Sequence, residues 1–419
     1  MQFDAPYRPM QKYRHMLVLT LLIGCALSMM LGSPQKPADD IALVGGKIYA
    51  SPAAQPIDDG VVIVKSGKIV AVGTRRSTTV PADIPTLNCS GKFITAGFQN
   101  SHVHFSEDKW NEAAQQPASK LNAQLAAMLL RYGFTTVIDT GSLLTNTVAL
   151  RRRIEAREVI GPRILTAGIP QYPPNGVPYY IKDGAPPDLL KMLPQPSTPV
   201  QAIGFIRQNV AGGADIVKLF TGSWISKQEV VAMPADVATA AVVEAHRRGR
   251  FVFAHPSNLA GLEVALRAHV DVAAHAIEDT RGFKTEHLQR MVAQEMALIP
   301  TLHLFSQDGN IADILKEVHD FRQEGGRILF GTDVGFLSDY DPTDEFIQMA
   351  RAGLTRQQIL ASLTTSPASR FGEATKHGRV EKGMDGDLVV LRNDPFADVH
   401  AFADVVAVVR GGQMVYQEP

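Results

Sequence analysis

The stretch Ile94-Thr95-Ala96-Gly97-Phe98-Gln99-Asn100-Ser101-His102-Val103-His104-Phe105 combines an apolar run, a glycine and two histidines two residues apart. Successive side chains of a strand point to opposite faces, so His102 and His104 would point the same way from a strand here. Two neutral imidazoles on one face can bind one metal ion of the zinc type. His-x-His also occurs by chance, so this interpretation depends on further ligands elsewhere in the chain.

The segments after His104 alternate between strand-like and helix-like patterns. Seven further strands are expected, at residues 134–139, 163–168, 214–220, 251–255, 270–275, 297–302 and 327–333. Eight βα units over roughly 270 residues match a TIM (β/α)8 barrel. A doubly wound open sheet is the competing fold, but no glycine-rich phosphate turn follows the first strand. Residues 169–199, rich in Pro, Gly and Tyr, are expected to form a long loop.

Both flanks of the barrel read as short strands joined by turns. Residues 41–94 contain several β-branched runs, and residues 376–417 return to the same pattern. We therefore expect an α/β protein with a hydrolase barrel at 95–375. A small composite β-sandwich domain is expected from both chain ends, at 41–94 and 376–417.

The first residues have the layout of an export signal. Basic residues precede the apolar run Met16–Leu31, and the small and polar stretch Ser33–Asp40 follows. We interpret residues 1–33 as a signal peptide or membrane anchor, so the protein is expected to be exported, periplasmic or secreted. Leu22-Ile23-Gly24-Cys25 also resembles a lipobox, which leaves a membrane-anchored lipoprotein through Cys25 as the alternative.

Composition points to a small-molecule substrate. The net charge is -1, with 45% hydrophobic and 20% charged residues, and no long run of either charge suggests nucleic acid as a partner. A membrane contact is expected only through the N-terminal segment, and a homo-oligomer remains open. Cys25 and Cys89 are the two cysteines, so no disulfide framework is expected.

Residues able to bind a metal recur at the ends of the expected strands. The carboxyl ends of barrel strands converge on one mouth, so such residues would meet there. The predicted metal ligands are His102, His104, Lys218, His255, His275 and Asp333. A lysine in the apolar strand around Lys218 is costly unless it is paired with a carboxylate or neutralised. Addition of carbon dioxide to its amine would instead give an anionic carbamate able to bridge two metal ions.

These residues, together with Gly331-Thr332-Asp333 and the tail Gly378–Pro395, resemble the amidohydrolase superfamily. The resemblance is greatest to its metal-dependent prolidase and Xaa-Arg dipeptidase branch, which is related to imidazolonepropionase. It implies two divalent metal ions, expected to be zinc. One would be held by His102, His104 and Asp333 and the other by His255 and His275, with carboxylated Lys218 bridging.

The resemblance also implies a function. A metal-bridging hydroxide would cleave a C–N amide bond of a dipeptide or N-acyl amino acid, with Asp333 as the catalytic proton carrier. Hydrolysis of a cyclic amide, lactam or ester is one alternative, and a non-catalytic exported metal-binding protein is another. His303, Tyr180 and Arg281 are the candidate substrate contacts, because each follows an expected strand or lies in the long loop.

Overall fold

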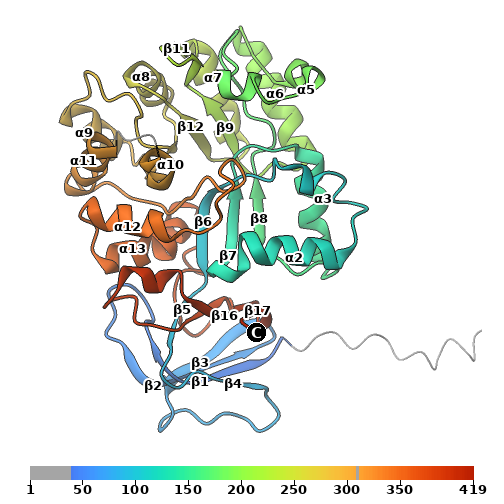
Figure 1. Cartoon of the computed structure of the whole chain (residues 1–419), viewed down its shortest axis with the longest axis vertical. Coiled ribbons are helices and arrows are strands. Elements are labelled where there is room, and N and C mark those ends of the chain that lie inside the picture. The colour runs from blue at the N-terminus through green and yellow to red at the C-terminus, as the bar shows by residue number, and fades with distance from the viewer. Residues whose placement is uncertain (1–38, 308–310) are drawn as a thin grey trace, which may run out of the picture. The chain divides into compact units, whose positions relative to one another are not determined.

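The computed structural model describes residues 39–307 and 311–419, and residues 39–419 form one compact unit (Figure 1). The predicted signal or anchor at 1–33, with the lipobox and Cys25, lies outside the described residues. In the part of the chain described, no helix has the length and apolar character needed to cross a bilayer.

Strands from both ends of the sequence share one sheet. From the N-terminal side come β1 (Ile41–Ile48), β2 (Ile57–Lys65), β3 (Lys68–Thr74), β4 (Thr86–Asn88) and β5 (Phe93–Ala96), and from the C-terminal side β15 (Leu388–Leu391), β16 (Val405–Arg410) and β17 (Gln413–Gln417). Their order is β17-β16-β15-β5-β1-β2-β3, with β4 paired to β1. Hydrogen bonds join all eight strands into a single sheet, so the predicted sandwich of two facing sheets is not shown.

Strand β5 is the junction of this sheet. It pairs in parallel with β1 on one edge and antiparallel with β15 on the other, where Ala96 lies opposite Leu388. Strand β1 is buried on both faces, because Leu43 packs in one apolar cluster and its neighbour Ala42 packs in another. This double burial explains the β-branched runs that predicted strands here.

Seven parallel strands follow, in two sheets. The first contains β6 (Phe98–Val103), β7 (Phe134–Asp139) and β8 (Arg163–Thr166), and the second β9 (Val217–Phe220), β12 (Val252–His255), β13 (Val272–Ala274) and β14 (Ala297–Ile299). Isolated bridges link the edges at Gln171 with Leu219, Leu298 with Ile328, and Val103 with Val334. The α/β architecture is as predicted, whereas a continuous closed barrel of eight strands is not shown.

The eighth predicted strand, 327–333, is not a regular strand. Its backbone lies between β14 and β6, because Leu329 donates to Leu298 (2.9 Å) and Ser101 donates to Phe330 (2.7 Å). The segment approaches its neighbours closely at Gly331, where a Cβ would come within 2.4 Å of Ile299. Asp333 then takes a φ of 59°, which ends the extended backbone.

Helices surround the parallel strands in Figure 1. The longer ones are α2 (Ala118–Met128), α3 (Leu144–Glu155), α6 (Pro199–Gly212), α7 (Ala235–Arg247), α8 (Leu259–Ala268), α9 (Thr285–Ala293), α11 (Ile311–Gln323), α12 (Thr343–Arg351), α13 (Arg356–Leu363) and α14 (Thr365–Arg370). Capping residues determine where these helices begin and end. Helix α6 begins after Thr198, whose side chain accepts from the Gln201 amide, and ends at Gly213 with a φ of 106°.

The segment between β8 and α6 is not a bare loop. It contains the short helices α4 (Tyr179–Lys182) and α5 (Pro187–Met192), and its apolar side chains pack with Phe220 of β9. A hairpin that was not predicted, β10 (Gly222–Ser226) with β11 (Glu229–Ala232), follows β9. The chain therefore places additional structure directly after two of its central strands.

Candidate metal centre

The predicted pair of histidines meets an aspartate at the end of β6. His102 lies in β6 and His104 directly after it, and Asp333 follows the irregular eighth segment. Asp333 Oδ1 is 3.2 Å from His102 Nε2 and 2.9 Å from His104 Nε2. One ligand atom from each of the three residues lies within 4.8 Å of the others, which is a spacing that one metal ion could bridge.

The remaining predicted ligands border this trio. The ring of His275 is centred 4.5 Å from that of His102 and 4.7 Å from that of His255. Lys218 of β9 is only 3% exposed, and its charge acts on all three histidines. The structure thus brings the four histidines and Asp333 together, with Lys218 of β9 close enough for its charge to act on His102, His255 and His275.

The protonation states of His102 and Asp333 suit the binding of a metal cation between them. Burial, then the charge of Lys218, lowers the pKa of His102 to about 3, so this imidazole is neutral at physiological pH. Burial lowers the pKa of Lys218 to about 7. Burial by itself would raise the pKa of Asp333, but the contacts of its carboxylate with the imidazoles of His102 and His104 hold that pKa well below its usual range. The neutral imidazole of His102 beside the ionised carboxylate of Asp333 suits a metal ligand set.

Several buried atoms of this cluster lack ordinary partners. Within the described residues, His102 Nε2, His255 Nε2 and Asp333 Oδ1 are shielded from solvent and make no well-aligned hydrogen bond, although Asp333 Oδ1 lies against the Nε2 atoms of His102 and His104. Buried polar atoms are normally satisfied, and their exceptions call for a ligand or a water. Three such atoms from three separate strands or segments fit a metal site.

A hydrogen bond to the backbone sets the orientation of His104. Its Nδ1 lies 2.7 Å from the carbonyl oxygen of Gly141, which can only accept, so Nδ1 carries the proton. Its Nε2 faces Asp333 Oδ1; burial lowers the pKa of His104, but the contact with Asp333 outweighs burial and raises that pKa overall. Asp139, at the end of β7, anchors this turn by accepting from Ser142 (2.6 Å) and the Gly141 amide (3.2 Å). Its position at a strand end was the signal by which sequence reasoning could have found it.

Of the three predicted substrate contacts, Tyr180 lies near enough to Asp333 for the charge of that carboxylate to act on it. Burial raises the pKa of Tyr180 well above its usual value, and the charges of Tyr172, Glu278 and Asp333 add to this effect. Its ring lies 5.5 Å from that of Phe336, which is half exposed. Tyr180 therefore forms an aromatic pair with Phe336 and lies within reach of the charge of Asp333.

His303 and Arg281 make local contacts. His303, in the short helix α10 (Leu302–Ser306), has its Nδ1 2.9 Å from Asp344 Oδ2. Arg281 forms two hydrogen bonds with Asp279, and its side chain is 84% exposed. The structure therefore does not bring Arg281 into the cluster, because the carboxylate two residues away already pairs with its guanidinium.

Sequence reasoning missed an aromatic wall beside His255. The ring of Phe220 stacks on that of His255 with 4.5 Å between centroids and 21° between planes. Tyr172 packs behind Phe220 at 4.6 Å. Phe220 lies two residues after Lys218 and so points the same way from β9, which is the alternation that could have identified it.

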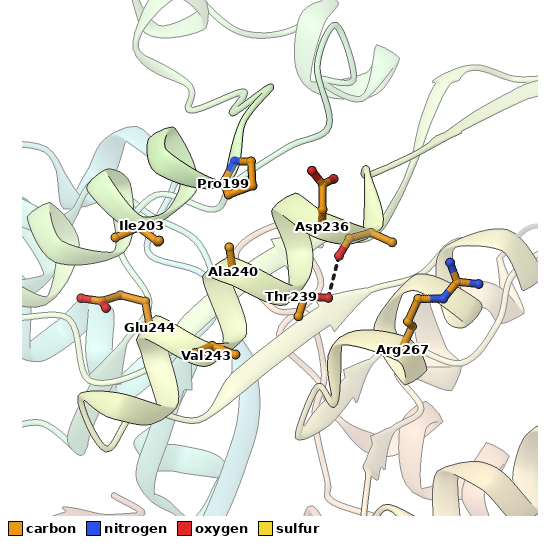
Figure 2. Close-up of a pocket in the computed structure, with 9 residues that line it drawn as sticks. Pro199, Ile203, Asp236, Thr239, Ala240, Val243, Glu244 and Arg267 are labelled. Carbon is orange, nitrogen blue, oxygen red and sulfur yellow. Dashed lines mark hydrogen bonds between the residues drawn. The ribbon is translucent and has the colours of Figure 1, made fainter.

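A surface groove lies apart from these residues. It has a volume of about 570 Å³. Figure 2 shows it between α6 and α7, with Arg267 of α8 at one side. Its lining is mostly apolar, with Ile203, Ala240 and Val243, and it contains none of the predicted ligands. Concavity alone therefore does not mark the candidate centre of this protein.

Several known proteins are similar to this chain in fold or in sequence. The fold is similar to a Bifidobacterium longum crystal structure that carries a provisional prolidase name, with 25% identity, a TM-score of 0.77, and coverage of 91% of this chain and 96% of that one. A Xaa-Pro dipeptidase structure with bound methionine is similar at 20% identity and a TM-score of 0.76, covering 90% and 100% of the two chains. Ochratoxinase of Aspergillus niger is 22% identical over 428 aligned residues, covering 86% of this chain and 83% of that protein.

A model of one family accounts for most of the sequence. The match, described as the amidohydrolase family, extends over residues 93–415 and so includes every residue of the candidate centre. The chain therefore belongs to the amidohydrolase family.

Proposed function

We propose that this hydrolase of carbon–nitrogen bonds is a binuclear metal enzyme that cleaves an amide bond of a small substrate, such as a dipeptide or an N-acyl amino acid. The observation that carries the proposal is that His102, His104 and Asp333 gather in one buried cluster, in which atoms of His102, His255 and Asp333 make no well-aligned hydrogen bond. The prolidase and dipeptidase names among the similar structures support the substrate class.

The residues divide into two ligand sets. His102, His104 and Asp333 would hold one divalent ion, and His255 and His275 the other, with carboxylated Lys218 between them. The pKa of Lys218, lowered to about 7 by burial, leaves much of its amine neutral and able to add carbon dioxide. Zinc is the metal proposed, because histidine and carboxylate ligands suit it.

The chain's own groups would then move the proton. Bound divalent ions supply an ionised water near neutral pH and polarise the scissile carbonyl. Asp333 accepts the proton of the nucleophile and gives it to the leaving nitrogen. The Asp333 carboxylate is buried within the proposed ligand cluster, beside His102 and His104, which supports this role.

Finer features of the architecture and setting remain our proposals. We propose a closed (β/α)8 barrel at 95–375 and a composite β-sandwich domain from 41–94 and 376–417. We also propose export directed by residues 1–33, with lipid attachment at Cys25 as the alternative, and a small-molecule substrate as the partner. A homo-oligomer is compatible with all of these.

A substrate panel tests the function. Purified protein lacking residues 1–33 should hydrolyse dipeptides or N-acyl amino acids, and a chelator should abolish this activity. Activity restricted to cyclic amides, lactams or esters would favour that second class, and metal binding without turnover on any substrate would favour the non-catalytic metal-binding protein.

Asp333→Asn tests the proton carrier. This variant should lose nearly all turnover while largely retaining its metal, because an amide oxygen can still ligate but cannot carry the proton. Asp313→Asn, at an exposed position of α11, is the matched control and should match the wild-type rate. Substantial turnover by Asp333→Asn would exclude the role.

A further inference from the structure

Thr301 has an unusual backbone conformation. It lies between β14 and α10 with φ 47° and ψ 52°, in the left-handed region, and it is fully buried. This region is rarely adopted by β-branched residues, since Cβ and its substituents crowd the backbone. A strained backbone conformation such as this one persists only where the surrounding structure stabilises it.

The Thr301 hydroxyl is directed away from its own helix. Thr301 is the N-cap of α10, yet its side chain makes no capping hydrogen bond. Threonine at this position normally accepts from the helix's first free amides. Here its Oγ1 lies 2.7 Å from His275 Nδ1 and 2.8 Å from the carbonyl oxygen of Pro300.

These two contacts determine the tautomer of His275. The hydroxyl has one hydrogen, and the Pro300 oxygen can only accept, so that hydrogen is donated to Pro300. The contact with His275 must then be a bond that Nδ1–H donates to Oγ1. In neutral His275 the other nitrogen, Nε2, is left with its lone pair, which is the form that binds a metal.

A buried acid takes over the capping that Thr301 does not perform. Glu345 of α12 is fully buried, and its Oε2 accepts from the His303 amide at 2.7 Å. The His303 amide, one of the first free amides of α10, is thus satisfied from another helix, which leaves the Thr301 hydroxyl for His275.

A second buried acid holds the backbone beyond His275. Glu317 of α11 accepts from the Ile277 amide with both carboxylate oxygens, at 2.9 and 3.1 Å. The backbone on either side of the His275–Thr301 contact is therefore anchored by an acid from an outer helix. These acids are 3% exposed or less, and neither belongs to the ligand set proposed above.

We propose that Thr301 is a positioning residue that holds His275 in its Nδ1–H tautomer, and that Glu345 maintains the left-handed turn this contact requires. The inference rests on the proposed function only in treating His275 as a metal ligand. The tautomer itself is a property of the metal-free chain.

Three substitutions of Thr301 distinguish the contribution of its hydroxyl from that of its left-handed backbone conformation. Thr301→Ser keeps the hydroxyl. Thr301→Val keeps the shape but removes the acceptor, and Thr301→Gly removes it while adopting the left-handed backbone freely. A merely structural threonine would tolerate glycine at this φ, whereas a positioning threonine would not.

Cobalt(II) titration of the metal-free protein provides the first measurement, with visible absorption reporting coordination. Wild type and Thr301→Ser should bind the same number of ions with similar affinity and the same spectrum. Thr301→Val and Thr301→Gly should bind the ion that His255 and His275 would share about 10–100-fold more weakly. Thr147→Val is the matched control and should resemble wild type, because Thr147 is equally buried on α3 and its hydroxyl makes no bond to any described residue.

Nitrogen-15 NMR of histidine-labelled, metal-free protein provides the second measurement. The His275 resonances should report Nδ1–H in wild type and Thr301→Ser, and a shift toward mixed tautomers in Thr301→Gly. The proposal would be overturned if Thr301→Val and Thr301→Gly kept both the wild-type cobalt affinity and the wild-type His275 tautomer. If Thr301→Val does not fold, the comparison of Thr301→Ser with Thr301→Gly tests the proposal. Wild type that binds no cobalt would refute the proposed metal centre, while the NMR comparison would still decide the role of Thr301.

Discussion

Replacing Lys218 with methionine should stabilise the metal-free protein while abolishing its activity. Lys218 is 3% exposed, in strand β9, and burial lowers its pKa from 10.5 to about 7. The lowered pKa means that the folded state disfavours the charged amine. Methionine has a similar length and no charge, so it removes this cost together with the proposed bridging group.

The magnitude follows from the two pKa values. Between pH 7 and 10.5 the unfolded chain carries a proton on this lysine that the folded chain lacks, so stability rises with pH in this window. The cost to the folded state is about 4 kcal/mol at pH 7 and about 2 kcal/mol at pH 9. Lys218→Met should therefore gain roughly these amounts over wild type, with the difference shrinking as the pH rises.

Urea denaturation of chelator-treated protein in bicarbonate-free buffer, at pH 7 and pH 9, measures the free energy of unfolding. Lys120→Met, at an exposed position of α2, is the matched control and should change it by less than about 0.5 kcal/mol. A metal-free Lys218→Met protein that is less stable than wild type at pH 7, or a gain that does not depend on pH, would refute the reasoning.

Three further predictions concern single side chains. Gly335→Ala should destabilise by more than about 2 kcal/mol in urea denaturation, because its Cβ would lie 1.9 Å from the His104 carbonyl oxygen at a φ of 97°. Gly372→Ala, with a φ of 74° and no atom within 4 Å, should cost only about 1 kcal/mol, and equal losses would contradict the steric account. Tyr180→Ala should raise KM for amide substrates about tenfold with little change in kcat. Tyr180→Phe retains the ring against Phe336 and should leave KM near the wild-type value. A fall in kcat alone in Tyr180→Ala would rule out a binding role. Arg281→Ala should leave KM and stability unchanged, and a marked rise in KM would restore it as a substrate contact.

The candidate centre was largely predictable from residue type and position. His102 and His104 share a face because strand side chains alternate, and His255 and His275 end strands that hydrophobic runs delimit well. The strand-end rule then brings them to one place without knowledge of their contacts. Arg281 shows the limit of this reasoning, since a pattern cannot show that a nearby carboxylate will pair with an exposed side chain.

The fold was predictable in its alternation and less so in its pairing. The hairpin of β10 and β11 escaped notice because its turn, Lys227-Gln228, lacks the glycine or asparagine that usually signals one. Residues 327–333 have a strand-like composition, but the close approach at Gly331 and the left-handed Asp333 depend on neighbours distant in sequence. The single eight-stranded sheet likewise depends on the pairing of β5 with β15, which no local period reveals.

That pairing has a consequence for how the protein is made. The edge of β5 that pairs with β15 stays unpaired until the ribosome has synthesised β15. Leu388 follows its partner Ala96 by roughly 290 residues, which corresponds to about 15–60 s of synthesis. An open strand edge is a template for pairing with other chains. A chain truncated before residue 388 would keep this edge exposed, so premature termination or proteolysis near the C-terminus should yield aggregates and not a smaller working enzyme.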